Sequence, residues 1–158
     1  MSGTWNIPVP HNEPVLGYAP GSSERAALKA ELARQAGQTV DIPVIVGGRE
    51  LRPGATTDVV MPHRHAHRLA TVHQADAAAM DAAVRSACEA QRDWAARPFE
   101  DRAAVFLRAA DLLAGPWRQV INAATMLGQS KTAFQAEIDS ACELIDFLRF
   151  NVHYAERL

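Results

Sequence analysis

The spacing of apolar and polar residues changes character along the chain. The first twenty residues hold four of the nine prolines and show no periodicity. Because proline cannot continue a helix, this stretch predicts an extended arm. The polar run at 21–24 then opens a short helical pattern that stops at about Gly37. From Asp76 onward, apolar residues recur about every 3.6 positions, which predicts successive helices.

Between the short helix and the long helical region, the pattern favours strands. The β-branched run 42–46 is followed by Gly47 and Gly48 and then by 49–52. This order matches a tight hairpin whose turn requires positive φ. Pro43 favours an edge position, because proline has no N–H to donate to a neighbouring strand.

A second strand pair is predicted at 58–61 and 69–72, on either side of a histidine-rich stretch. His63, His65 and His67 alternate, so an extended backbone would place all three rings on one face, as a metal site would require. Neighbouring residues of one strand rarely reach a common tetrahedral centre, and no carboxylate accompanies them. We therefore expect an exposed polar hairpin loop, with metal binding as a weaker alternative.

Four helices are predicted after Asp76. The first two span about 76–96 and 100–114, the third opens at Pro116, and the fourth opens at a capping-box spacing between Thr132 and Gln135. Each helix carries a mainly apolar stripe. In the first two helices the stripes are Met80, Val84, Ala87, Gln91 and Trp94, and Ala103, Phe106, Ala110 and Leu113. In the third and fourth they are Trp117, Val120, Ile121 and Ala124, and Ile138, Cys142, Ile145, Leu148 and Val152.

Composition narrows the class of protein. A formal charge of -2 and the lack of a dense Lys/Arg block argue against nucleic acid as a partner. No apolar run approaches the roughly 20 residues that span a bilayer, and the N-terminus has no signal-peptide pattern. Cys88 and Cys142 lie in helical patterns without metal-ligand spacing, so we expect reduced thiols in a cytoplasmic protein.

The order of these pieces resembles the start of an aldehyde dehydrogenase, and its last thirty residues resemble the L-glutamate γ-semialdehyde (1-pyrroline-5-carboxylate) branch of that family. The residues that carry the resemblance are Asn12-Glu13-Pro14-Val15-Leu16, the Gly-Gly hairpin, Asp101-Arg102-Ala103, Gly128-Gln129-Ser130-Lys131-Thr132, Gln135-Ala136-Glu137-Ile138-Asp139, and Glu143-Leu144-Ile145-Asp146-Phe147.

The resemblance implies an NAD-dependent enzyme that oxidises glutamate semialdehyde to glutamate in proline breakdown, as a homo-oligomer. Because Met1 lies close to the Asn-Glu-Pro phrase, we expect the stand-alone enzyme and not a fusion behind a proline dehydrogenase. In this family the catalytic cysteine, the water-activating glutamate and the nucleotide-binding sheet come later in the chain. The resemblance therefore implies no catalytic residue, no bound cofactor and no metal here, and an inactive chain.

Glu143 is the one residue to which the resemblance assigns a role, because it matches a family glutamate that faces the amino group of the substrate. A carboxylate opposite an ammonium would distinguish an amino acid aldehyde from a plain one. Judged from the residues alone, Glu143 is an ordinary exposed helix residue in an acidic strip with Asp139 and Asp146. Phe147 and Phe150 lie within reach of the same wall, but aromatic residues at helical spacing are more often core.

The predicted fold class is α+β and mostly helical, with an arm, two hairpin-like strand pairs and about five helices, but without the Rossmann sheet. We expect residues 1–20 to form the arm and 21–158 to form the N-terminal helical and hairpin portion of an NAD-binding domain. A second hypothesis is a stand-alone helical module for protein interaction or oligomerisation, with Trp94, Phe106 and Trp117 at its interface.

Overall fold

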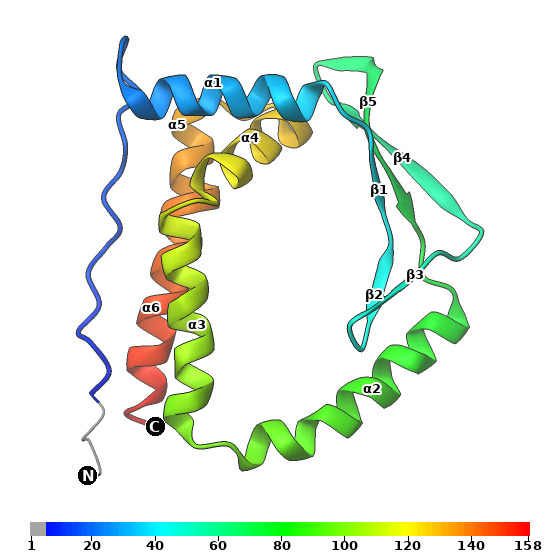
Figure 1. The fold of residues 1–158 in the computed structure, drawn as a ribbon, viewed down its shortest axis with the longest axis vertical. Helices are drawn as coiled ribbons and strands as arrows, with labels where there is room; N and C mark the ends of the chain where they lie inside the picture. The colour runs from blue at the N-terminus through cyan, green and yellow to red at the C-terminus, as the bar shows by residue number, and fades with distance from the viewer. Residues whose placement is uncertain (1–5) are drawn as a thin grey trace. The chain divides into compact units, whose positions relative to one another are not determined.

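The structure, a computed structural model, describes residues 6–158, so the first five residues of the predicted arm lie outside the described part. Its contacts divide the chain into two compact units (Figure 1). The first unit comprises Met1–Ala33, Pro98–Met126 and Lys131–Leu158, and the second comprises Arg34–Arg97 and Leu127–Ser130.

The first unit is helical apart from the arm. Residues 6–19 contain neither helix nor strand. Four helical elements lie wholly in this unit: α3 (Phe99–Ala114), α5 (Ala133–Ala136), η1 (Glu137–Cys142) and α6 (Glu143–Ala155). Two more helices, α1 (Ser23–Ala36) and α4 (Arg118–Gln129), lie mostly in it.

The predicted capping box is confirmed at the start of the last helical stretch. The hydroxyl of Thr132 accepts from the backbone N–H of Gln135 at 3.3 Å, and the side chain of Gln135 accepts from the N–H of Thr132 at 2.9 Å. The long helix that is predicted to start there forms, and only residues 137–142 depart from the α pattern. A π-helical segment, η1, separates α5 from α6, and the N–H of Glu143 bonds to the carbonyl of Ile138.

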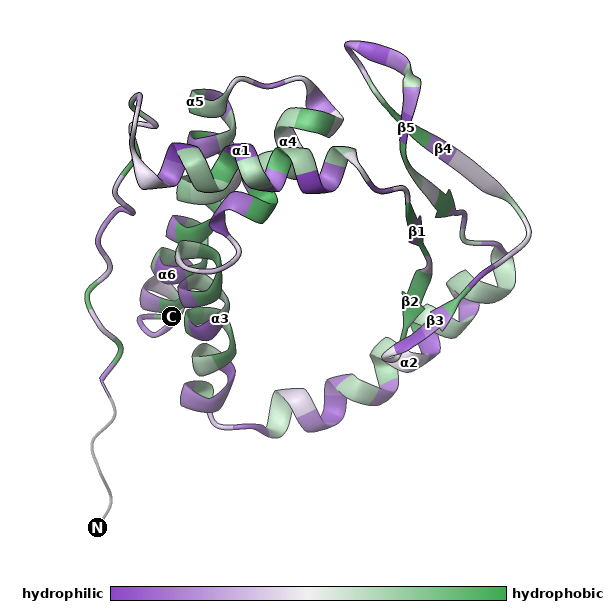
Figure 2. Ribbon diagram, turned by 45° about the horizontal axis from the view of Figure 1, so that its top comes forward, coloured by the Kyte–Doolittle hydropathy of each residue, from purple (hydrophilic) through white to green (hydrophobic). Residues whose placement is uncertain are grey.

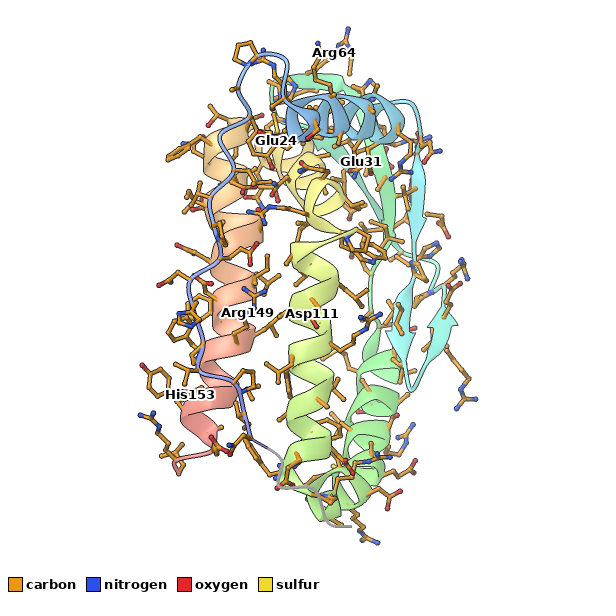
Figure 3. The ribbon with its side chains drawn as sticks, turned by 60° about the vertical axis from the view of Figure 1, so that its left-hand side comes forward. Glu24, Glu31, Arg64, Asp111, Arg149 and His153 are labelled. Carbon is orange, nitrogen blue, oxygen red and sulfur yellow. The ribbon has the colours of Figure 1, made fainter. Side chains whose placement is uncertain are left out.

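Three small apolar clusters hold the first unit together, and the arm contributes to two of them. Ile7 of the arm packs with Ala103 and Val152, and Tyr18 packs with Leu28 and Ala123. The third cluster is Ala110, Ala141 and Ile145. The arm beyond residue 6 is therefore a packed part of the unit, and Figure 3 shows it running alongside α6, next to Arg149.

The second unit contains all the strands of the described chain and one helix. β4 (Thr56–Met61) pairs antiparallel with β5 (Arg64–His73), and β1 (Val40–Ile42) pairs parallel with the other edge of β5. β2 (Val44–Val46) and β3 (Arg49–Leu51) form a separate hairpin. Helix α2 (Ala77–Ala96) follows, with the side chain of Asp76 accepting from the N–H of Ala79 at 2.8 Å.

The hairpin at the two glycines is confirmed, but the run that precedes it is not a single strand. Gly47 and Gly48 have φ values of 56° and 75°, which suit a type I′ turn. Pro43 divides the run into β1 and β2, which belong to different sheets. Proline lacks the N–H that a continuous ladder needs, so the chain changes partner at that residue.

The histidine-rich stretch was predicted to be a loop, and most of it is strand instead. The turn comprises residues 62–63, and β5 begins at Arg64, so that His65 and His67 belong to the strand. The register pairs Met61 with Arg64 and Val60 with Arg68, so residues 65–67 have no partner in β4. Irregular pairing between Val59 and Met61 absorbs the mismatch in strand lengths.

Few side chains of the second unit are buried. Met61, Ala70 and Ala79 are buried there, whereas β1 is exposed along its whole length although its residues are mainly hydrophobic (Figure 2). Helix α2 forms where its period predicted it, but Met80 and Val84 of its apolar stripe are exposed. Within the described residues, this unit leaves apolar surface uncovered.

Candidate functional site

Glu137 is a charged residue in the interior of the first unit, with an exposed fraction of 0%, as low as that of its neighbour Asn122. One oxygen of its carboxylate accepts from the backbone N–H of Leu16 at 2.8 Å, and the other accepts from the hydroxyl of Tyr18 at 2.7 Å and the amide of Asn122 at 2.8 Å. The guanidinium of Arg118 completes the set as an ion pair. The carboxylate is therefore satisfied by two arm residues and two residues of α4.

A second carboxylate joins this cluster through Arg118. One carboxylate oxygen of Glu13, in the arm, accepts from Nη1 of Arg118 at 2.5 Å, and the other accepts from Nη1 of Arg149 at 2.6 Å. Arg118 also donates to the carbonyl of Pro14 at 2.7 Å. Two arginines and two glutamates thus balance in charge, which is the condition under which buried ions are tolerated. We call Glu13, Arg118, Glu137 and Arg149 the charge cluster.

The pKa values within the cluster reflect burial opposed by pairing. Burial alone raises the pKa of Glu137, but the hydrogen bonds from Arg118, Leu16, Tyr18 and Asn122 outweigh it and hold that pKa below its ordinary value. Burial lowers the pKa of Arg118, and the bonds to Glu137 and Glu13 more than reverse this, so the guanidinium stays charged. Every carboxylate oxygen of Glu137 is occupied, so the cluster fastens the arm and has no acceptor left for a substrate.

Two neighbours of the cluster are kept neutral. Burial, followed by the hydrogen bond to Glu137, raises the pKa of Tyr18 to about 12. Burial, followed by the charge of Glu137, raises the pKa of Cys142 to about 11. The Cys142 thiol is therefore a poor nucleophile at neutral pH, because the thiolate is the reactive form.

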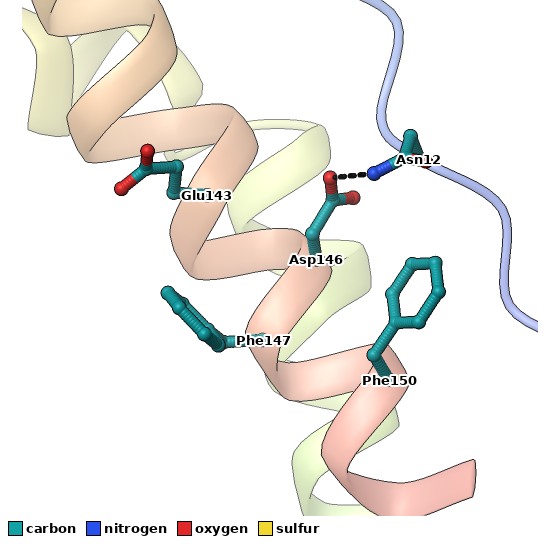
Figure 4. A pocket seen from close by; sticks show the side chains of 5 residues that line it. All are labelled: Asn12, Glu143, Asp146, Phe147 and Phe150. Carbon is teal, nitrogen blue, oxygen red and sulfur yellow. Dashed lines mark hydrogen bonds between the residues drawn. The ribbon is translucent and has the colours of Figure 1, made fainter.

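A hollow of about 340 Å³ lies beside the cluster, between the arm and one face of α6 (Figure 4). Its lining residues are Asn12, Glu143, Asp146, Phe147 and Phe150. Apart from Asn12, they stand at spacings of three, four and seven on α6, so they share one helix face.

The two acidic residues of the hollow differ in their surroundings. Asp146 accepts from the amide of Asn12 and from the N–H of Glu13, both at 2.7 Å. Glu143 is exposed, and within residues 6–158 its carboxylate makes no hydrogen bond or ion pair. Glu143 is thus the carboxylate of the hollow that has room for a cation from outside.

The residues predicted from sequence fall in different places. Asp139, expected in an acidic strip with Glu143, pairs with Lys131 and does not line the hollow. Cys88 is exposed on α2, and Cys142 is buried. The charge cluster was missed altogether, because hydrophobic periodicity assigns charged helix residues to the exterior.

The three histidines have separate surroundings. His63 contacts the hydroxyl of Ser130 at 2.7 Å, and His67 contacts the carbonyl of Ala36 at 2.9 Å. Among residues 6–158, no group of three or more His, Cys, Asp or Glu side chains is arranged to hold a metal ion. The same residues contain no helix with the length and apolar character needed to span a bilayer.

Comparison with known proteins places this geometry in a family. The sequence model described as "Aldehyde dehydrogenase family" matches residues 51–158. The chain is 49% identical over 153 residues to the mitochondrial delta-1-pyrroline-5-carboxylate dehydrogenase of Dictyostelium discoideum, covering 97% of this chain and 27% of that protein. It is 47% identical over 156 residues to the delta-1-pyrroline-5-carboxylate dehydrogenase of Agaricus bisporus, covering 98% and 29%.

The solved structures agree. The delta-pyrroline-5-carboxylate dehydrogenase of Mycobacterium tuberculosis bound with NAD superimposes with a TM-score of 0.96 at 58% identity, covering 99% of this chain and 30% of that one. The chain therefore belongs to the aldehyde dehydrogenase family, with the fold of the N-terminal part of its members, and the predicted family and fold class are confirmed. It spans less than a third of the length of these relatives.

Proposed function

We propose that this chain is the N-terminal part of an NAD-dependent dehydrogenase that oxidises L-glutamate γ-semialdehyde to L-glutamate. The support is similarity over nearly the whole chain to relatives named for 1-pyrroline-5-carboxylate, one of them solved with NAD bound. NAD would supply the hydride acceptor in the complete enzyme. Homo-oligomerisation and a cytoplasmic location stay predictions, and the relative from Dictyostelium is named as mitochondrial.

The role proposed for this segment is one wall of the substrate site, with Glu143 facing the amino group of the substrate. The observation that carries it is the free carboxylate of Glu143 in the hollow. The other lining residues are two phenylalanines, Phe147 and Phe150, and the pair Asn12 and Asp146, which are bonded to each other. An ammonium beside that carboxylate gains a charge-assisted hydrogen bond in partly apolar surroundings.

On its own the chain is proposed to be inactive. Oxidation of an aldehyde by this route needs a thiolate, a hydride acceptor and a base that activates water. Burial and the raised pKa make Cys142 unsuitable as the nucleophile. The test is an assay of the purified 158-residue chain with NAD and glutamate semialdehyde. NADH formation above the blank, or saturable NAD binding by calorimetry, would contradict this proposal.

A chimera tests the substrate wall directly. The matching segment of the M. tuberculosis enzyme is replaced by this chain, and the product is expected to oxidise glutamate semialdehyde. E143Q should raise KM for that substrate about 10- to 100-fold, because a hydrogen bond to a charged group contributes roughly 1.5–3 kcal/mol, and should leave a plain aliphatic aldehyde unaffected.

D139N is the matched control for this chimera, because Asp139 lies near Glu143 in sequence, pairs with Lys131 and is outside the hollow. It removes the same charge and should behave as the parent chimera. An inactive chimera, or an E143Q effect that is equal on both aldehydes, would refute the proposed wall.

The exposed aromatic residues favour a second candidate, a helical interaction module. Trp94, Phe106 and Trp117, which were predicted to cover an interface, are 39%, 44% and 55% exposed. Light scattering on the intact chain and on a truncation of α6 separates the two candidates. A single defined oligomer that depends on α6 supports the module, and a polydisperse chain supports the enzyme segment.

A further inference from the structure

The helical stretch from residue 133 to residue 155 changes its hydrogen bonding just before Glu143. Residues of α5 and α6 follow the α pattern, and Glu137–Cys142 follow the π pattern. A π-turn closes one residue later than an α-turn, and such segments are rare in helices and frequently lie at functional sites. Because an α-helix turns by about 100° per residue, one extra residue re-aims every side chain that follows it.

The buried positions on both sides of η1 show what the extra residue achieves. Glu137, Ala141 and Ile145 all have an exposed fraction of 0%, and they are separated by steps of four. In an uninterrupted α-helix a step of four drifts by about 40°, so Glu137 and Ile145 would diverge by about 80°. The π segment takes up this drift, and the polar anchor and the apolar core then share one side of the helix.

The arm fixes the helix on both sides of Glu143. Upstream, the N–H of Leu16 donates to Glu137 at 2.8 Å, and downstream the N–H of Glu13 donates to Asp146 at 2.7 Å. Two backbone donors three residues apart on an extended segment therefore hold the helix before and after the exposed carboxylate. The rotation of the intervening turns is set by these two bonds together with the burial of Ile145.

We propose that Glu137 is a positioning residue for the hollow: its burial in the charge cluster holds the π segment, and the π segment aims Glu143 and Phe147 at the hollow and away from the core. The identity of the ligand of the hollow rests on the proposed function, whereas the orientation of its side chains does not depend on that proposal. A merely structural Glu137 would stabilise the unit without setting the environment of Phe147.

Fluorine NMR on the chain labelled with 4-fluorophenylalanine tests this orientation through the chemical shift of each phenylalanine ring. The five phenylalanines give five signals, of which Phe147 and Phe150 report the hollow and Phe106 on α3 reports elsewhere. In the ligand-free chain, E137Q is expected to shift the signals of Phe147 and Phe150 and to leave that of Phe106 in place. D139N changes an exposed carboxylate of the same π segment and should shift none of them.

A milder variant keeps the test decisive if E137Q does not fold. Y18F removes one hydrogen-bond donor to Glu137 while preserving the ring that packs with Leu28. It should shift the same two signals by a smaller amount. Unchanged Phe147 and Phe150 signals in folded E137Q or Y18F, or equal shifts of all five signals, would overturn the positioning role.

Titration then separates this inference from the proposed function. L-glutamate is the probe, and glutarate, which lacks the amino group, is its control. In the parent chain L-glutamate should move the Phe147 signal more than glutarate does, and E137Q should weaken that response about tenfold. If the parent responds equally to both probes, the substrate wall is refuted, whereas the ligand-free shifts still decide the role of Glu137.

Discussion

Arg118 and Glu137 form an ion pair that is almost completely removed from solvent, with exposed fractions of 5% and 0%. They come from different helical elements, α4 and η1, and the arm closes over both. A buried pair of this kind stabilises a fold only while both partners are present, since either one alone is a buried, uncompensated charge.

Arg118→Leu should therefore destabilise the first unit strongly. It leaves Glu137 and one oxygen of Glu13 without their cation, and the expected loss is about 3–5 kcal/mol in the free energy of unfolding. Urea denaturation followed by circular dichroism measures it. Arg52→Leu is the control, because the pairs of Arg52 with Asp41 and Glu50 are exposed, and ion pairs that water and salt screen contribute little to stability. Equal losses in the two variants would contradict the burial of the cluster.

Stability should fall in acid through Glu137. Its pKa is lower in the folded chain than the ordinary value of 4.5. The ionised form therefore contributes stability that is fully present above that value and is lost as the pH falls through the lower folded pKa. Denaturation midpoints measured from neutral pH into acid should decline less steeply for E137Q than for the parent chain. D139N should keep the parent slope, and a parent-like slope in E137Q would exclude Glu137 as the source.

The two thiols should react at very different rates. Cys88 is exposed on α2, whereas Cys142 is buried and its pKa is raised to about 11. At pH 8 a thiol reagent should modify one cysteine quickly and the second only when urea opens the fold. Mass spectrometry of the labelled chain locates the modified residue. C88S should abolish the fast phase, and a fast phase that survives in C88S would mean that Cys142 is accessible.

Gly47→Ala should destabilise the hairpin of the second unit. Gly47 has a φ of +56°, and a Cβ added there would meet the hydroxyl oxygen of Ser86 at 2.8 Å. The left-handed conformation alone costs a residue with a side chain about 1–2 kcal/mol. Gly17→Ala is the control, since a Cβ at that position meets nothing within 4 Å. Thermal unfolding of the two variants compares them, and a neutral Gly47→Ala would contradict the turn geometry.

The features that the sequence predicted correctly depend on residues close together along the chain. The capping box of Thr132 and Gln135, the turn at Gly47 and the start of α2 after Asp76 each involve neighbours within four positions. Local chemistry decides them, and they formed as expected. The role proposed for Glu143 in the hollow came from the family resemblance and not from the residues alone.

The features that the sequence did not predict depend on partners far away. Glu137 is buried because Tyr18 and Leu16, more than a hundred positions earlier, bring donors to it. Periodicity carries no information about such partners. It placed Trp117 and Ala124 on the apolar stripe of the third predicted helix, whereas Trp117 precedes α4 and both residues are exposed. The parallel pairing of β1 with β5 was missed for the same reason, because Pro43 indicates a break in the strand but does not indicate which strand β1 pairs with.

The bond from Arg149 to Glu13 joins residues that are 136 positions apart. During synthesis the arm leaves the ribosome before α6 does, so the arm must remain undocked while more than a hundred further residues are made. Contacts of such separation are slow to form, because a long loop has to close before they contribute. Docking of the arm should therefore be a late step in folding, and the charge cluster and the hollow beside it should be assembled only when the rest of this unit is in place.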